Sequence, residues 1–389
     1  MLRATFRPER LPKRPPPGAP ESVTEPVLRP SLPVEVLDDV RTARSDPASA
    51  GGSERETKRE PIFRVGELVS GQFEVRAVIG EGGMAQVVEA HDHVLDRRVA
   101  LKAAWPNPRI PPLRNEARAL AAFRHPSLVT VHAIGEHRGI EYIVMERIYG
   151  VPLSEHLRRR HQAAAIFAID EVLDLLVELA EGVAVVHRAG VAHRDIKPGN
   201  VMLTPDRRVV LMDFGLVLPE VSVGDQTLVA GSPPYMAPEA LTNTVETGEG
   251  HLVDLYALGV LAFELLTGER PFAETTMEAL YRVHGTQAVP DVRALRPEVP
   301  LKLGALLGEM LAKAPQDRPP SAESVAWRLA GIRDALRAAE ERARGMSSLP
   351  AARSAPPSTP PESEASSPSL PEAPSVAYID VLIVEDDED

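Results

Sequence analysis

A polar stretch in the middle of the chain combines two carboxylates and an amide in a pattern suited to phosphate chemistry. It reads H-R-D-I-K-P-G-N over residues 193–200, followed by D-F-G at residues 213–215. Asp195 can accept the proton of a hydroxyl group, while Asn200 and Asp213 supply the hard oxygen ligands that suit Mg²⁺. Either motif alone could arise by chance in a polar loop before a turn. Their close succession, thirteen residues from Asn200 to Asp213, indicates a site.

The pattern H-R-D-x-x-x-x-N followed by D-F-G resembles the catalytic loop and metal-binding motif of the protein kinase family. The resemblance implies that Asp195 takes the proton of the substrate hydroxyl and that Lys197 stabilises the transferring phosphoryl group. It also implies that Asn200 and Asp213 hold Mg²⁺ and that ATP is the phosphoryl donor. Lys197, two residues after Asp195, is typical of the serine/threonine class of this family.

A glycine-rich segment, G-E-G-G-M-A-Q-V over residues 80–87, nearly fits G-x-G-x-x-G-x-V. Glycines let a backbone close over phosphates, although a plain hairpin turn is the default interpretation of a lone glycine-rich loop. Because the segment lies between two predicted strands and not before a helix, it resembles the kinase phosphate loop and not a dinucleotide-binding fingerprint. Ala85 replaces the third glycine, and Gly83 offsets that departure. The sequence G-E-G-G-M-A resembles the corresponding loop of bacterial serine/threonine kinases. The nucleotide-binding residues expected here are Ile79, Gly80, Glu81, Gly82, Gly83, Met84, Ala85, Gln86 and Val87.

Lys102 ends a predicted strand in V-A-L-K and matches the family lysine that holds the α- and β-phosphates. Its expected ion-pair partner is Glu116, on a predicted helix over residues 113–123. A helix glutamate more often lies on a solvated face, and that alternative stays open for Glu116.

The segment over residues 141–148 resembles the strand and hinge that link the two lobes of a kinase. Met145 would lie behind the adenine, or be ordinary core, and the backbone of Glu146 and Ile148 would bond the base. The apolar faces around the adenine would come from Val87, Ala100 and Met202.

Downstream, residues 231–239 read G-S-P-P-Y-M-A-P-E, with Ser232 where the family usually has threonine. The resemblance implies that Glu239 pairs with Arg318. It also implies that Arg194 anchors a phosphorylated loop, for which Ser222, Thr227 and Ser232 are available and Thr227 is favoured. An unmodified polar loop is the alternative.

The predicted elements that must position these residues fall into two groups. Alternating residues predict strands over 73–79, around 98–102, and near 129–134 and 141–145. Helices are predicted from a cap at Asp170 to a stop at Gly190, and over 255–266, 301–313 and 321–344. A small β-rich lobe followed by a larger helical lobe is the α+β bilobal kinase fold that the motifs imply.

Composition separates this domain from its flanks. Of 389 residues, 43% are hydrophobic, and ten of the 38 prolines lie in residues 1–60 and eight in 346–389. We expect a disordered Pro/Arg-rich tail over 1–62 and a kinase domain over 63–345, with lobes 63–148 and 149–345. A Pro/Ser-rich linker would follow over 346–375, then an acidic tail over 376–389.

The acidic tail reads V-A-Y-I-D-V-L-I-V-E-D-D-E-D from residue 376 and resembles the first strand and acidic cluster of a receiver domain. The expectation is a truncated or reduced receiver, with a simple acidic tail as the alternative. Deletion of 346–389 is expected to leave kinase activity within about twofold.

Charge and composition also limit the classes of partner that the sequence predicts. The net charge is −13, of which residues 346–389 contribute −8, and no basic stripe indicates nucleic acid. No cysteine is present, which is compatible with the expected cytoplasmic location, and no apolar run approaches a membrane span.

The sequence therefore predicts an ATP- and Mg²⁺-dependent kinase of protein serine and threonine residues that could self-associate to phosphorylate itself. The alternatives are a pseudokinase acting as a nucleotide-binding scaffold and a kinase of small molecules. Phosphate transfer to a generic protein would separate these readings.

Overall fold

The computed structural model describes residues 60–82, 85–106, 113, 114, 117, 121, 123–213, 232–274 and 276–347. Several expectations lie outside these residues: the tail before residue 60, the receiver resemblance, the loop with Ser222 and Thr227, and the positions Gly83, Met84 and Glu116. Most of the helix expected over 113–123 lies outside them as well.

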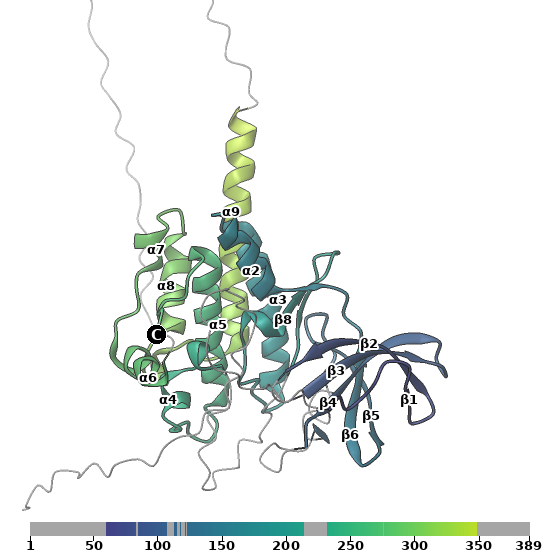
Figure 1. Ribbon diagram of the computed structural model, residues 1–389. Helices are drawn as coiled ribbons and strands as arrows, with labels where there is room; N and C mark the ends of the chain where they lie inside the picture. Colours follow the sequence, from purple (N-terminus) through teal and green to yellow (C-terminus); the bar gives the residue numbers. More distant parts are fainter. Residues whose placement is uncertain are drawn as a thin grey trace, which may run out of the picture. The chain divides into compact units, whose positions relative to one another are not determined.

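The first half of the domain is a six-stranded antiparallel sheet in the order β1-β2-β3-β4-β6-β5 (Figure 1). The predicted strands are confirmed. Burial alternates along β3 and the first residues of β2, whereas β4 is buried without interruption from Val99 to Ala103. Lys102 pairs in register with Val87 on one neighbouring strand and with Ile143 on the other. The bounds are β1 Leu68–Val69, β2 Phe73–Glu81, β3 Ala85–Asp92, β4 Arg97–Ala104, β5 Val131–His137 and β6 Ile140–Glu146.

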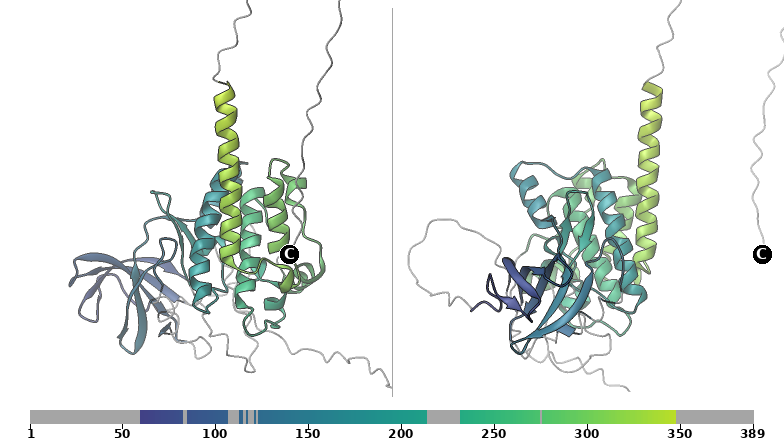
Figure 2. Two further views of the ribbon diagram at one scale, coloured as in Figure 1. Left: turned by 180° about the vertical axis from the view of Figure 1, so that it is seen from behind. Right: turned by 90° about the vertical axis from the view of Figure 1, so that its right-hand side faces the viewer.

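The second half is helical, with one small sheet. Strands β7 (Val151–Pro152), β8 (Val201–Leu203) and β9 (Val209–Leu211) form that sheet. Figures 1 and 2 show β1–β6 gathered in one group and the helices in another, which confirms the bilobal α+β expectation. The helices are α2 Leu153–Gln162, α3 Ile169–Arg188, α4 Pro238–Leu241, α5 Gly250–Thr267, α6 Met277–Thr286, α7 Val292–Leu295, α8 Leu301–Met310 and α9 Ala322–Ser347. Short 3-10 turns cover Pro198–Asn200, Pro233–Tyr235 and Pro315–Asp317.

Helix α3 differs at its start from the prediction. Asp170 does not cap it: Ala168 occupies the cap position and makes no side-chain cap hydrogen bond. Asp170 lies instead in the first turn, where a carboxylate still interacts favourably with the positive end of the helix dipole. The predicted stop is confirmed, because Gly190 follows the helix with φ +71°, a conformation that glycine adopts without strain.

Helix α5 is the centre of the helical group. Its side chains join those of α3, α8 and α9 in one large core cluster. Among the described residues it is the one helix long and apolar enough to cross a membrane, but 83% of it is buried inside the protein. It is therefore a core helix, as the apolar run over 255–263 indicates.

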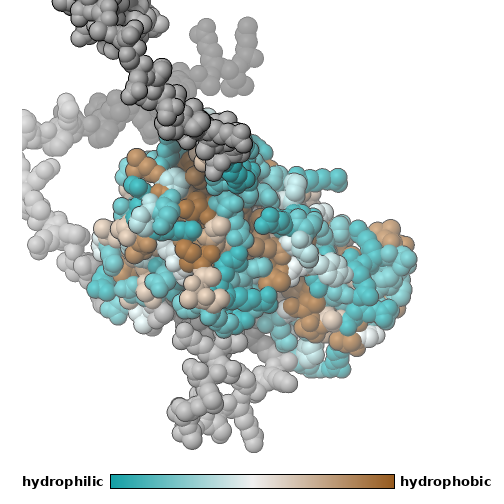
Figure 3. Space-filling model, turned by 90° about the horizontal axis from the view of Figure 1, so that it is seen from above, coloured by the Kyte–Doolittle hydropathy of each residue, from teal (hydrophilic) through white to brown (hydrophobic). Residues whose placement is uncertain are grey.

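The protein surface mixes polar and apolar residues. On the face in Figure 3, polar residues cover much of the surface and apolar residues form separate patches between them. Such a mixture is ordinary, because more than half of a protein's accessible surface comes from apolar atoms.

Candidate active site

Asp195 is the centre of a closed set of hydrogen bonds. The Asn200 side chain donates to both the carbonyl and Oδ2 of Asp195, each at 2.8 Å. Lys197 Nζ lies 3.0 Å from the same Oδ2. The hydroxyl of Ser232 donates to Oδ1 at 2.9 Å and accepts from Lys197 at 2.6 Å. A carboxylate, a cation and an alcohol thus meet at one point.

The backbone before Asp195 is fixed by Asp254, which is fully buried on α5. Its Oδ1 accepts from the Arg194 N–H at 2.7 Å, and its Oδ2 accepts from the His193 N–H at 2.7 Å and from His187 Nε2 at 2.8 Å. Burial would raise the pKa of the Asp254 carboxyl, but the hydrogen bonds from His187 and from the His193 N–H hold that pKa below its ordinary value. Arg194 has φ +64°, and these contacts hold it in that strained conformation.

His193 connects the loop of Asp195 to the strand that leads to Asp213. Its Nε2 donates to the Met212 carbonyl at 3.0 Å, and its Nδ1 accepts from the Asp195 N–H at 3.2 Å. This pair of bonds requires a neutral ring, in agreement with burial that lowers the pKa of His193. Met212 in turn donates its N–H to the Asn200 carbonyl at 2.8 Å, so both the N–H and the carbonyl of Met212 are hydrogen-bonded.

Asp213 lies within reach of Lys102. The distance between Lys102 Nζ and Asp213 Oδ1 is 3.3 Å. The ammonium group of Lys102 lowers the pKa of the Asp213 carboxyl, which therefore stays charged at neutral pH. Asp213 has φ +54°, a strained value for a residue other than glycine. The strand before it is fixed by the Leu211 N–H, which donates to the Ser127 carbonyl at 2.9 Å.

The residues expected to hold a metal ion fit Mg²⁺ by their chemistry. The nitrogen of the Asn200 amide is committed to Asp195, which leaves the amide oxygen for a cation. The Asp213 side chain is 41% exposed and charged. When Mg²⁺ also binds phosphates and waters, the protein typically supplies only one or two oxygen ligands. Asn200 and Asp213 match that number. Within the described ranges there is no cluster of three His, Asp or Glu residues that could hold an ion alone.

The residues expected around an adenine ring come together between the sheet and the small helical-lobe strands. Ala100 on β4 pairs in register with Met145 on β6. Met145 packs against a cluster that contains Ile148 and Met202, and also against a second cluster under the sheet. Met145 is thus part of the core and adjoins the expected pocket, so both readings of this residue fit its position.

The backbone of the hinge is already partly engaged. The Glu146 N–H donates to the Thr130 carbonyl at 2.8 Å, so only its carbonyl would be available to a base. The Ile148 carbonyl accepts from the guanidinium of Arg147.

Two ion pairs flank the hinge, and no sequence pattern predicts either of them. Glu146 pairs with Arg208 at 2.6 Å, and Arg147 pairs with Glu89 on β3 at 2.9 Å. The partners are far apart in the sequence, so no local pattern indicates them.

The described residues of the glycine-rich segment end β2 and begin β3, which pair antiparallel as the β2–β3 hairpin. Gly80 pairs with Val87 and Glu81 with Gln86, while the Gly82 N–H donates to the Ala85 carbonyl at 3.0 Å. Ile79 and Glu81 are exposed on β2.

The Gln86 side chain is directed elsewhere. It is fully buried, and its Oε1 accepts from the Phe63 N–H at 2.8 Å. Any contact of Gln86 with a nucleotide would therefore come from its backbone.

The predicted pair of Glu239 and Arg318 is confirmed, with Arg318 Nη1 2.6 Å from Glu239 Oε1. It anchors the segment that follows Ser232.

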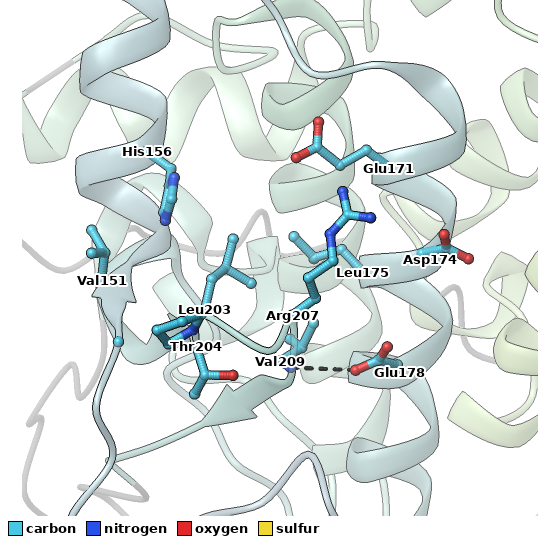
Figure 4. A pocket seen from close by; sticks show the side chains of 12 residues that line it. Val151, His156, Glu171, Asp174, Leu175, Glu178, Leu203, Thr204, Arg207 and Val209 are labelled. Carbon is cyan, nitrogen blue, oxygen red and sulfur yellow. Dashed lines mark hydrogen bonds between the residues drawn. The ribbon is translucent and has the colours of Figure 1, made fainter.

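A hollow of about 510 Å³ lies away from these residues, between α2, α3 and the β8–β9 hairpin (Figure 4). Its acids are already engaged: Glu171 with Arg160, Asp174 with Arg337, and Glu178 with the Val209 N–H. The three acidic side chains of the hollow thus already have hydrogen-bond partners.

Comparison with known proteins places these features in a family. The model of the protein kinase domain matches residues 73–328. The chain is 32% identical to the probable serine/threonine-protein kinase pknA2 of Bifidobacterium longum, over 68% of this chain and 36% of that protein. It is 32% identical to the serine/threonine-protein kinase PrkC of Bacillus subtilis, over 72% of this chain and 43% of that protein.

A third relative is the serine/threonine-protein kinase PknA of Mycobacterium tuberculosis, which is 33% identical over 76% of this chain and 68% of that protein. The match to the first two relatives thus spans less than half of their length. The match to the family model covers well over half of this chain, and the chain belongs to the protein kinase family.

Proposed function

We propose that this chain transfers the γ-phosphoryl group of ATP to serine and threonine hydroxyls of proteins, in a reaction that requires Mg²⁺. The observation that carries the proposal is the hydroxyl of Ser232, which donates to Asp195 Oδ1 at 2.9 Å while it accepts from Lys197. An alcohol oxygen flanked by a carboxylate and an ammonium group is the environment that a substrate hydroxyl needs. Three relatives named as serine/threonine kinases support the substrate class.

Each residue of the site has a defined part in this reaction. Asp195 accepts a hydrogen bond from the attacking hydroxyl, orients it, and receives its proton as the bond to phosphorus forms. Lys197 neutralises negative charge on the transferring group, and Lys102, held near Asp213, binds the phosphates that remain. Mg²⁺, when bound through Asn200 and Asp213, neutralises charge on the phosphate oxygens.

The nucleotide would lie beneath the β2–β3 hairpin, with its base near Ala100, Met145 and Met202. Ala100 and Met202 are buried and Met145 is partly buried. These apolar side chains suit a flat ring, because a ligand pocket is mostly apolar with a few polar groups that fix orientation. The ion-pair role of Glu116 toward Lys102 stays a prediction.

Activation by phosphorylation belongs to the same proposal. A phosphate on Thr227, carrying about −1.5 to −2 charges, would pair with Arg194 and order the loop. Transfer between two copies of the chain would supply that phosphate. The support is Arg194 itself, whose backbone is fixed by Asp254 next to Asp195.

The proposal is tested with ATP labelled in the γ-phosphate and a generic protein such as casein, with and without Mg²⁺. Labelled phosphoserine and phosphothreonine that form only with Mg²⁺ would support it. Nucleotide binding without any transfer would favour a pseudokinase, and transfer only to small alcohols would favour a small-molecule kinase.

A further inference from the structure

We propose that Trp105 is a positioning residue that holds the glycine-rich hairpin over the nucleotide through the carbonyl of Gly82. The indole Nε1 of Trp105 donates a hydrogen bond to this carbonyl at 2.9 Å. Trp105 follows directly after β4, and Gly82 follows directly after β2. The inference rests on the proposed function, because it requires that a nucleotide bind beneath this hairpin.

The placement of Trp105 on the sheet makes it a rigid support. Side chains alternate along β4, and Leu101, Ala103 and Trp105 share the face that packs into the core cluster of the sheet. Lys102 lies on the opposite face. Trp105 is 8% exposed, so its ring is anchored by packing while its N–H reaches the edge of the sheet. An indole N–H can only donate, and a loop carbonyl is a suitable acceptor for it.

The bond from Trp105 completes the engagement of Gly82. The Gly82 N–H donates to the Ala85 carbonyl at 3.0 Å, so both backbone groups of this exposed glycine are held. Glycine loses more conformational freedom than any other residue when it becomes ordered. A hairpin that is already held in place loses less conformational entropy when a ligand binds. Its affinity for a ligand beneath it is therefore higher.

The other strand of the hairpin is held from the same side of the sheet. Gln86 on β3 is fully buried and accepts the Phe63 N–H at 2.8 Å. Phe63 and Trp105 belong to the same core cluster. Phe63 and Trp105 thus hold the hairpin from one side, through one hydrogen bond at Gly82 and one at Gln86.

The chain provides a matched pair of substitutions, because it has only two tryptophans. Trp105→Phe keeps an aromatic ring in the core and removes the N–H. Trp327→Phe makes the same chemical change on α9, at a side chain that is 78% exposed. For Trp105→Phe we expect the Kd for Mg·ADP and the KM for ATP to rise about three- to tenfold, since one neutral hydrogen bond is lost. We expect kcat to stay within about twofold, because the transfer groups are untouched.

A fluorescence measurement tests the same idea with Trp105 intact, even if Trp105→Phe fails to fold. In the Trp327→Phe protein, Trp105 is the only tryptophan, so its emission should change as Mg·ADP is added. The midpoint should match the Kd from calorimetry.

The outcomes separate the two claims. Unchanged Kd and KM in a folded Trp105→Phe protein would overturn the role of Trp105, and so would an emission that does not change at saturating Mg·ADP. If calorimetry shows no nucleotide binding to the unaltered protein, the proposed function fails first and this inference fails with it. Weaker binding in Trp105→Phe, with Trp327→Phe like the unaltered protein, would support the inference.

Discussion

Arg318 and Glu239 form a two-point ion pair, with Nη1 to Oε1 at 2.6 Å and Nη2 to Oε2 at 2.8 Å. Both side chains are buried, and Arg318 also donates to the carbonyls of Ala312, Leu252 and Lys313. The pair joins α4 to the segment between α8 and α9. Helix α4 follows the 3-10 turn that begins directly after Ser232. The ion pair therefore fixes the position of the segment that carries Ser232.

Breaking this pair should be costly. Removal of one partner leaves a buried charge without compensation, so Arg318→Ala should lower the free energy of unfolding by about 3–5 kcal/mol. Chemical denaturation measures this loss. Arg328→Ala is the matched control, because Arg328 and Glu309 are partly exposed and that pair should contribute at most about 1 kcal/mol. Equal losses in the two variants would contradict the special role of the buried pair.

Ser232→Ala should reduce phosphate transfer by about ten- to hundredfold. It removes the hydroxyl that joins Lys197 to Asp195, and hydrogen bonds to charged groups are among the stronger ones. Ser232→Thr keeps the hydroxyl and should retain most activity. Steady-state kinetics with ATP and casein measure the effect, and the idea fails if the alanine and threonine variants behave alike.

Asp254→Asn should lower kcat by about ten- to hundredfold, with a smaller effect on the KM for ATP. The amide turns one acceptor oxygen into a donor that faces the N–H groups of His193 or Arg194, so the backbone before Asp195 loses support. Asp174→Asn is the control, since Asp174 pairs at the surface with Arg337. A normal kcat in Asp254→Asn would show that this carboxylate does not position the loop.

His284 should make the protein sensitive to acid. Burial, and then the nearby Lys313, lower the pKa of His284 to about 4. The pKa of a histidine in the unfolded state is about 6.5. At pH values between the two pKa values the unfolded state binds more protons than the folded state, so the unfolding free energy falls as the pH falls. Between pH 6.5 and pH 5, urea unfolding should show about 1.5 kcal/mol more loss in the unaltered protein than in His284→Gln. Parallel losses would contradict this account.

Much of the fold follows from local patterns in the sequence. Strand β3 and the first residues of β2 have alternating burial. Asn200 bonds to Asp195 and also to Met212, the neighbour of Asp213, so the two motifs lie together as the family resemblance implies. The end of α8 was predicted too late, at residue 313 instead of Met310. The apolar pattern continues through Leu311, which is buried although the helix has ended, so periodicity alone does not mark the stop.

Contacts between distant segments could not be predicted. The indole of Trp105 reaches Gly82 only because β4 and the hairpin end at the same edge of the sheet. Likewise, Arg208 reaches Glu146 because the β8–β9 hairpin lies beside the hinge. Such pairs depend on how elements pack, which a single sequence does not encode in any short pattern.

The most direct test of the proposed function is phosphate transfer by Asp195→Asn. Asn keeps the shape of the side chain but cannot accept the substrate proton, so transfer from ATP to casein should fall at least about a thousandfold from a turnover of roughly 1–100 s⁻¹. Calorimetry should show that the variant still binds Mg·ATP, because Lys102, Asn200 and Asp213 remain. Transfer at the unaltered rate by the Asp195→Asn protein would contradict the assignment of Asp195 and the mechanism built on it.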